Sequence, residues 1–217
     1  MKVGTDSVLL GAWAEVGDAQ KVLDIGTGTG ILALMMAQKS KAKITAIEID
    51  EAAALQAQNN VKKSPWSDRV RVFPTSLQNF NSDILFDVII TNPPFFVSSL
   101  KNPDEQRTIA RHSDSLPFES LLDGVNRFLT ADGIFYLVLP KSQSAFFENM
   151  ANDKGFYLRK ILRVKARQKD ELEIRHLLAF SRTQQVVADS LLSIEKEYRH
   201  EYTEEYKKLT KDFYLKF

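Results

Sequence analysis

Hydrophobic residues occur along this chain in two alternating patterns, short apolar runs of strand length and longer segments of helical period. Apolar runs predict strands at 21–25, 42–48, 69–73, 87–91, 134–139, 156–165 and 176–181. Segments of helical period predict helices at 31–38, 51–62, 118–129 and 143–154. Strands that alternate with helices predict an α/β fold, with a mainly parallel sheet, helices on both faces and ligands at the carboxyl ends of the strands.

The last part of the chain has a different pattern. Aromatic and apolar residues recur every three or four positions, so they would line one side of a helix: Tyr198, Tyr202, Tyr206, Leu209 and Phe213. We therefore expect one domain over 1–185, followed by a C-terminal helical tail over 186–217 that packs on the domain through this stripe. Base stacking is the alternative use of such a stripe.

Composition and charge exclude several classes of function. With 29 Lys and Arg against 28 Asp and Glu, the net charge is +1, so any contact with nucleic acid must come from a local patch. The absence of cysteine excludes disulfides and thiolate chemistry, and three scattered histidines predict no metal site. The sequence has no signal peptide and no run of about 18 apolar residues. We expect a soluble, cytoplasmic protein without metal or membrane partners.

The apolar run at 87–91 ends abruptly at Asn92, Pro93 and Pro94, and two aromatic residues follow, Phe95 and Phe96. Proline lacks an N–H and holds the preceding residue extended, so the strand stops here in rigid backbone. The Asn92 side-chain oxygen and the Pro93 carbonyl could accept both hydrogens of a planar amine while a ring stacks on its face. The stretch reads as a holder for a planar amine. The alternative is a Pro-Pro turn with both phenylalanines in the core.

A glycine-rich loop joins the first predicted strand to the first internal helix. Asp24 precedes Gly26, Gly28 and Gly30, which is a layout that brings backbone close to a ligand at a helix N-terminus. Dinucleotide binding would require the third glycine at position 31, which is Ile31. The spacing therefore disfavours a dinucleotide.

An acidic residue ends the next predicted strand. Glu48 lies about 20 residues beyond the loop, where a carboxylate accepts hydrogen bonds from ribose hydroxyls in nucleoside-binding sheets. Ile49 could pack on an adenine face. Asp50 is the competing acid, but it is better explained as the N-cap of the helix at 51–62.

Taken together, the loop from Asp24 to Gly30 and the stretch from Asn92 to Phe96 resemble the paired signature of S-adenosylmethionine-dependent amino-methyltransferases of the Asn-Pro-Pro-aromatic type. Residues 2–13, 98–104, 110–112, 202–206 and 209–214 further resemble the bacterial tRNA1(Val) (adenine-N6)-methyltransferase family. The resemblance implies a Rossmann-like class I methyltransferase fold with seven strands, the last antiparallel. Members of the family usually carry residues rich in Phe, Lys and Gln before this point.

The resemblance also implies roles for individual residues. The glycine loop would curve around the methionine end of S-adenosyl-L-methionine, with Asp24 near its ammonium group. Related enzymes often use an acid to meet the adenine amino group, but here that position is Ser76, with Gln78 as a second possibility. The catalytic set would be Asn92, Pro93, Pro94 and Phe95, with Asn92 also touching the cofactor.

The implied reaction is methylation of N6 of the adenine next to the anticodon, position 37, in tRNA(Val), by a monomer that binds the anticodon loop. Alternatives are guanine-N2 methylation of ribosomal RNA, glutamine-N5 methylation of release factors, and a non-catalytic RNA-binding module with a vestigial cofactor fold.

Two further segments could contact RNA. The first is the loop after the Pro-Pro stretch, which holds Lys101, Arg107, Arg111 and His112 and reads as a lid, an RNA contact or a solvated loop. The second is a basic row that recurs at period two: Arg163, Lys165, Arg167 and Lys169. Such a row suits phosphate contacts, and a solvated sheet edge with acidic neighbours is the alternative.

Overall fold

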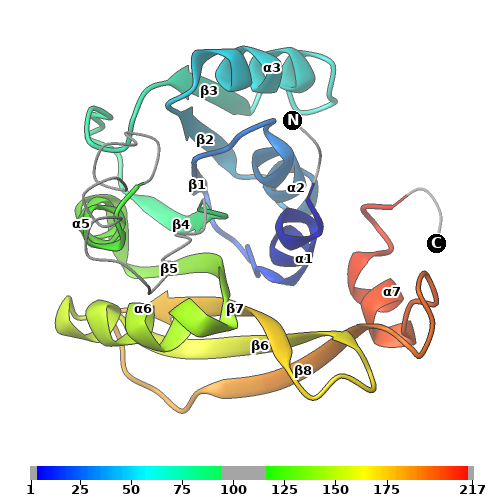
Figure 1. The fold of residues 1–217 in the computed structure, drawn as a ribbon. Helices are drawn as coiled ribbons and strands as arrows, with labels where there is room; N and C mark the ends of the chain where they lie inside the picture. The colour runs from blue at the N-terminus through cyan, green and yellow to red at the C-terminus, as the bar shows by residue number, and fades with distance from the viewer. Residues whose placement is uncertain (1–3, 94–115, 215–217) are drawn as a thin grey trace, which may run out of the picture.

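One twisted sheet runs through the computed structural model, which describes residues 4–93 and 116–214 (Figure 1). Its eight strands lie in the order β3-β2-β1-β4-β5-β7-β6-β8. Their bounds are β1 Lys21–Ile25, β2 Lys43–Glu48, β3 Val70–Pro74, β4 Phe86–Thr91, β5 Leu129–Pro140, β6 Tyr157–Arg167, β7 Glu173–Ser181 and β8 Ala188–Glu195. The α/β class predicted from the sequence is confirmed.

The first five strands are parallel, because each is followed by a helix or a long connection that returns the chain to the same end of the sheet. β7 runs antiparallel to both of its neighbours, β5 and β6. β8 is parallel to β6. The expectation of seven strands was therefore one strand short.

Helices cover both faces of the sheet. On one face lie α1 Thr5–Trp13, α2 Ile31–Lys39 and α3 Glu51–Lys62, and on the other α5 Phe118–Phe128 and α6 Lys141–Asp153 (Figure 1). Alternation along each strand feeds two cores: Val22 and Ile90 face the first set of helices, while Leu23 and Ile89 face the second. Within the described residues, no helix is long and apolar enough to cross a membrane.

The C-terminal part corrects the expected helical tail. Residues 188–195 form β8, and only α7, Glu204–Thr210, is helical. Backbone pairing with β6 and burial of Leu192 outweigh helical propensity there. The chain then turns through His200, whose φ of +69° does not fit a helix, and Tyr198 is left 68% exposed.

The rest of the aromatic stripe does pack on the domain. Tyr206 is 3% exposed in the core that α1 and α2 share, and Tyr202, Leu209 and Phe213 lie against the same core. The docking use of the stripe is therefore confirmed for these four positions, whereas Tyr198 does not take part.

Candidate functional site

The ends of the two central strands place the glycine loop beside Asn92. Ile25 at the end of β1 pairs with Thr91 at the end of β4. The buried Thr91 hydroxyl also donates to the Ile25 carbonyl oxygen at 2.8 Å. Gly26 follows the end of β1 and Asn92 follows the end of β4. Because these strands are adjacent and parallel, the glycine loop and Asn92 lie at the same edge of the sheet.

The glycine loop has a backbone that requires glycine. Gly26, Gly28 and Gly30 have φ of +68°, +58° and +85°, in the left-handed region that side chains disfavour. The N–H groups of Gly26 and Thr27 donate to the Ile47 carbonyl at 2.9 and 3.0 Å, which fastens the loop to the end of β2. A Cβ on Gly30 would lie 3.3 Å from Ala57 Cβ in α3, so glycine also permits close packing of the two segments.

Asp24 is a buried acid directly beneath the loop. Its Oδ2 accepts hydrogen bonds from the Thr27 hydroxyl and from the Ala33 N–H at 3.1 Å. Gly30, the N-cap of α2, has no side chain that could accept a hydrogen bond from the first turn of the helix. Asp24, which lies in β1, supplies that acceptor instead. Its Oδ1 is buried and has no hydrogen-bond partner among the described residues. Burial raises the pKa of Asp24 to about 7, with the charge of Glu48 adding to the effect and the two hydrogen bonds opposing it.

Glu48 lies on the other side of the glycine loop and is 9% exposed. Its Oε2 accepts from the Gly28 N–H at 2.8 Å, and its Oε1 accepts from the Asp50 N–H at 3.0 Å. Asp50 caps α3 by accepting from the Ala53 N–H at 2.6 Å, as the sequence predicts. Ile49 is 62% exposed next to them.

Ser76 follows β3 in the turn that adjoins Glu48, where the Thr75 N–H donates to the Glu48 carbonyl at 2.9 Å. Its hydroxyl oxygen accepts from the Asn79 N–H at 3.2 Å. Ser76 thus lies at the same edge as the loop and Glu48.

Asn92 is half buried and has a partner that the sequence analysis missed. Its Nδ2 donates to the Ser7 hydroxyl oxygen at 2.9 Å, so the amide nitrogen faces α1 and the carbonyl oxygen Oδ1 is at the opposite end of the group. Pro93 is buried behind it. Pro94, Phe95 and Phe96 lie outside the described residues. So do the basic residues of the following loop: Lys101, Arg107, Arg111 and His112.

An ion pair holds α1 at this position. Arg175 Nε at the start of β7 donates to Asp6 Oδ2 at 2.8 Å, and Asp6 adjoins Ser7. Residues from α1, β4 and β7 therefore meet at one edge. The only signal for Ser7 and Asp6 in the sequence was the likeness of residues 2–13 to the methyltransferase family.

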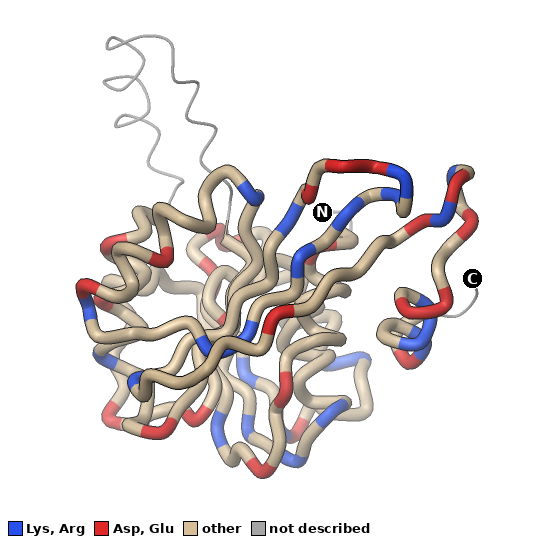
Figure 2. The backbone as a smooth tube through the Cα atoms, turned by 90° about the horizontal axis from the view of Figure 1, so that it is seen from below, with Lys and Arg blue, Asp and Glu red and all other residues tan. Residues whose placement is uncertain are grey.

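Two arginines of the expected basic row, both on β6, are paired with acids. Arg163 forms bonds of 2.9 to 3.1 Å with Asp189, and its Nη1 lies 3.7 Å from Glu173 Oε2. Arg167 Nε lies 3.5 Å from Asp170. In Figure 2, basic and acidic residues are interspersed over the described chain. The solvated interpretation fits these two arginines better than phosphate contact, although β8 covers β6, so β6 is not an edge strand.

A fold with this strand order, a glycine loop over a buried acid and a second acid at the end of β2 is that of a class I methyltransferase. The family model described as "Methyltransferase small domain" matches residues 3–152. A predicted O-methyltransferase of Agrobacterium tumefaciens has a TM-score of 0.72 at 17% identity over 95% of this chain and 96% of that one. A putative RNA methyltransferase of Pyrococcus horikoshii has a TM-score of 0.58 at 21% identity, with 82% of each chain covered. These two structures show the fold.

Curated relatives are much closer in sequence. A tRNA1(Val) (adenine(37)-N6)-methyltransferase of Bacteroides thetaiotaomicron is 46% identical over 99% of this chain and 91% of its own length. One of Flavobacterium psychrophilum is 44% identical over 100% of this chain and 93% of its own length. The chain belongs to the tRNA1(Val) (adenine(37)-N6)-methyltransferase family.

The residues at this edge fit the cofactor of the class, S-adenosylmethionine. An ammonium group would satisfy the unpartnered Asp24 Oδ1, which is buried and otherwise costly to leave without a partner. A Cβ built on Gly26 would meet nothing within 4 Å, so the loop leaves open space beside it.

Proposed function

We propose that this protein methylates N6 of adenine 37 in tRNA1(Val), with S-adenosylmethionine as methyl donor. The pairing of Ile25 with Thr91 carries the proposal, because it sets the cofactor loop and Asn92 side by side at one sheet edge. The relatives' names supply the target base and the RNA. They do not support guanine-N2 or glutamine-N5 methylation.

On this proposal Asp24 Oδ1 would hold the ammonium group of the cofactor, and the positive-φ glycines would let backbone approach its methionine end. Glu48, which here accepts from the Gly28 N–H, would accept from the ribose hydroxyls. Ile49 would pack on the adenine, and Ser76 would meet its amino group. When bound, S-adenosylmethionine supplies an electrophilic methyl group on a sulfonium.

Asn92 and Pro93 hold the target amine. Asn92 Oδ1 and the Pro93 carbonyl accept the two N6 hydrogens, which moves the nitrogen toward tetrahedral geometry and frees its lone pair for in-line attack. We also assign Pro94 and Phe95, or Phe96, to the catalytic set, with one ring as the stacking partner of the base; all three lie outside the described residues. As the N–C bond forms, the S–C bond to the methyl group breaks and S-adenosylhomocysteine is the second product. The acidity of the amine rises in this step, so one N6 proton can pass to water and a strong base is not required.

The surroundings of the reaction follow from the same chemistry. An unpaired base of the anticodon loop leaves its stack at low cost. The methyl group is already activated by the sulfonium, so the proposal needs no metal. Every group of the site comes from one chain, so a monomer suffices. We place the reaction in the cytoplasm, where tRNA is found.

Incubation with labelled S-adenosylmethionine and total tRNA from cells that lack the enzyme tests the proposal. Nucleoside analysis should show label in N6-methyladenosine, and sequencing should place it at position 37. Label in N2-methylguanosine, or label only in release-factor glutamine when that protein is added, would refute it.

Asn92→Ala tests the amine holder. Loss of the acceptor should lower kcat roughly 100-fold or more, while the affinity for S-adenosylhomocysteine, measured by calorimetry, stays within about twofold of wild type. Asn149→Ala on the exposed surface of α6 is the matched control and should change neither quantity. If the wild type binds no S-adenosylhomocysteine, the non-catalytic RNA-binding module becomes the better account.

A further inference from the structure

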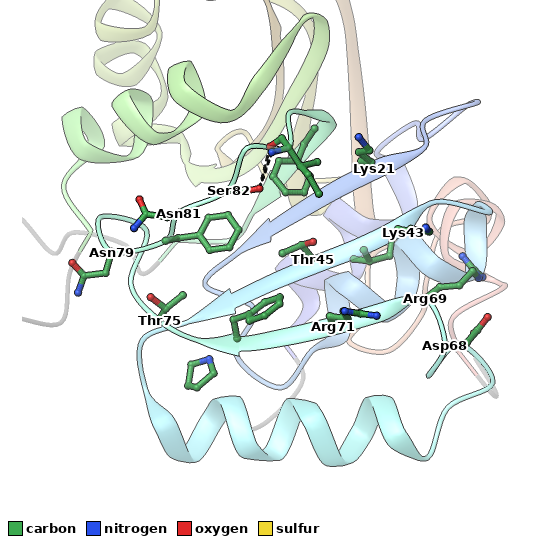
Figure 3. Close-up of a pocket in the computed structure, with 16 residues that line it drawn as sticks. Lys21, Lys43, Thr45, Asp68, Arg69, Arg71, Thr75, Asn79, Asn81 and Ser82 are labelled. Atoms are coloured by element: carbon green, nitrogen blue, oxygen red, sulfur yellow. Dashed lines mark hydrogen bonds between the residues drawn. The ribbon is translucent and has the colours of Figure 1, made fainter.

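A cavity of about 700 Å³ lies on the sheet face opposite α3, over β1, β2 and β3 (Figure 3). On this face α5 and α6 pack with Leu23, Ile89 and Phe135, toward the middle of the sheet. No helix joins β3 to β4 in the described residues, because residues 75–85 form turns and loop. The outer strands of this face are therefore left open, and Phe73 is 42% exposed.

Cations line this groove. Lys21 and Lys43 are paired neighbours on β1 and β2, and Thr45 pairs with Arg71 on β3. Since alternate residues of a strand share a face, Lys43 and Thr45 point the same way, and Arg71 joins them. The residues around the groove include four basic side chains, Arg69 being the fourth, and one acid, Asp68 (Figure 3).

Three of the four cations are available to a ligand. Arg69 is occupied, because its guanidinium donates to the carbonyls of Ala37, Ser40 and Ala42 at 2.9 to 3.1 Å. Lys21, Lys43 and Arg71 are exposed and form no ion pair within the described part of the chain, in contrast to the paired arginines of β6.

We infer that this groove binds the phosphate backbone of the substrate RNA, outside the target loop. The inference rests on the proposed function. Lys21 and Lys43 are the first residues of β1 and β2, and Arg71 is the second residue of β3. Since neighbouring strands lie about 4.8 Å apart, the three cations span about 10 Å across the sheet and can contact a stretch of backbone instead of a single phosphate. The groove extends from these cations, at the amino ends of the strands, to Thr75, whose N–H donates to the Glu48 carbonyl at the carboxyl ends, where the candidate site lies (Figure 3).

The position suits an RNA that is larger than the target loop. Neighbouring strands lie about 4.8 Å apart and successive residues of a strand about 3.3 Å apart, so Arg71 lies roughly 17 Å from Asn92, the residue after β4. A base held at Asn92 leaves the adjoining stem of the same molecule free to reach the groove. The cations favour a polyanion over a protein partner, because charged residues, lysine among them, are depleted at the centres of protein–protein interfaces.

The test measures RNA binding separately from methyl transfer. The triple variant Lys21→Gln, Lys43→Gln and Arg71→Gln is compared with wild type for binding of unmodified tRNA in S-adenosylhomocysteine, from about 50 to 200 mM salt. Lys62→Gln with Lys63→Gln, exposed at the end of α3, is the matched control.

The triple variant should bind tRNA at least roughly tenfold more weakly at low salt, and the slope of log affinity against log salt should be shallower by roughly one per cation removed. It should bind an isolated anticodon-loop oligonucleotide as wild type does, and its S-adenosylhomocysteine affinity and its kcat at saturating tRNA should be unchanged. Equal tRNA affinity and equal salt slope in wild type and triple variant would refute RNA binding in this groove. A protein ligand would then be the better interpretation of the groove. Failure of wild type to methylate tRNA would instead overturn the proposed function.

Discussion

At the scale of single residues, the buried carboxyl of Asp24 makes folding stability depend on pH. Burial raises its pKa from 3.8 to about 7, so the folded state holds the proton more tightly than the unfolded state. The raised pKa adds up to about 4 kcal/mol to the free energy of unfolding. This contribution is complete below about pH 4 and is lost as the pH rises through about 7.

Asp24→Asn should remove that dependence, because the amide stays neutral and its oxygen can still accept from Thr27 and Ala33. Denaturant unfolding at pH 5 and pH 8 should show the variant gaining free energy of unfolding relative to wild type as pH rises. Asp18→Asn, at an exposed position, should follow wild type. A difference between Asp24→Asn and wild type that does not change with pH would contradict the assignment.

Ser7 orients the Asn92 amide, so its loss should affect turnover more than binding. Ser7→Ala should lower kcat roughly fivefold to tenfold, the value of about one hydrogen bond, while KM for S-adenosylmethionine stays near wild type. Ser7→Thr keeps the hydroxyl and should recover most of the activity. In an Asn92→Ala background, Ser7→Ala should have little further effect, and additive losses would show that Ser7 acts elsewhere.

Local sequence predicted where Asp24, Glu48 and Asn92 would lie, because each lies at or just beyond the end of a strongly apolar strand and parallel strands end at one edge. It could not predict the partners of Asn92 and Arg175. Those bonds join residues 85 and 169 positions apart, so no local pattern encodes them.

At the scale of elements, the tail shows why periodicity alone misjudged a segment. A 3.6-residue spacing suited Tyr198 as well as Tyr206. However, the chain up to Glu195 is strand β8, which pairs with β6, and it then turns at His200 before α7 begins. Sheet pairing with a distant strand is not visible in the spacing of side chains on the tail itself.

Tyr206→Ala should lower the free energy of unfolding by about 3 kcal/mol, because it empties a site in the core between α7 and α1. Tyr198→Ala should change it by less than about 0.5 kcal/mol, because this ring is exposed. Denaturant unfolding of both variants measures the difference. Equal losses of free energy in the two variants would instead support the continuous helical stripe that the sequence predicted.

At the scale of the whole molecule, the expected domain boundary at 185 can be tested by truncation. A chain of residues 1–185 lacks β8 and α7, which leaves the outer side of β6 unpaired and uncovers the core that Leu192 and Tyr206 fill. We expect this chain to aggregate or to lose a cooperative unfolding transition. A soluble fragment that unfolds cooperatively near the temperature of the full chain would support the boundary.

The central claim is that cofactor and target amine meet at one edge of the sheet, beside the ends of β1 and β4. A crystal structure of the protein with S-adenosylhomocysteine and an adenine nucleotide measures this directly. We expect the ammonium group at Asp24 Oδ1, the ribose at Glu48 and the adenine N6 within hydrogen-bonding distance of Asn92 Oδ1. An adenine bound elsewhere, or an Asn92 carbonyl turned away from it, would contradict the account.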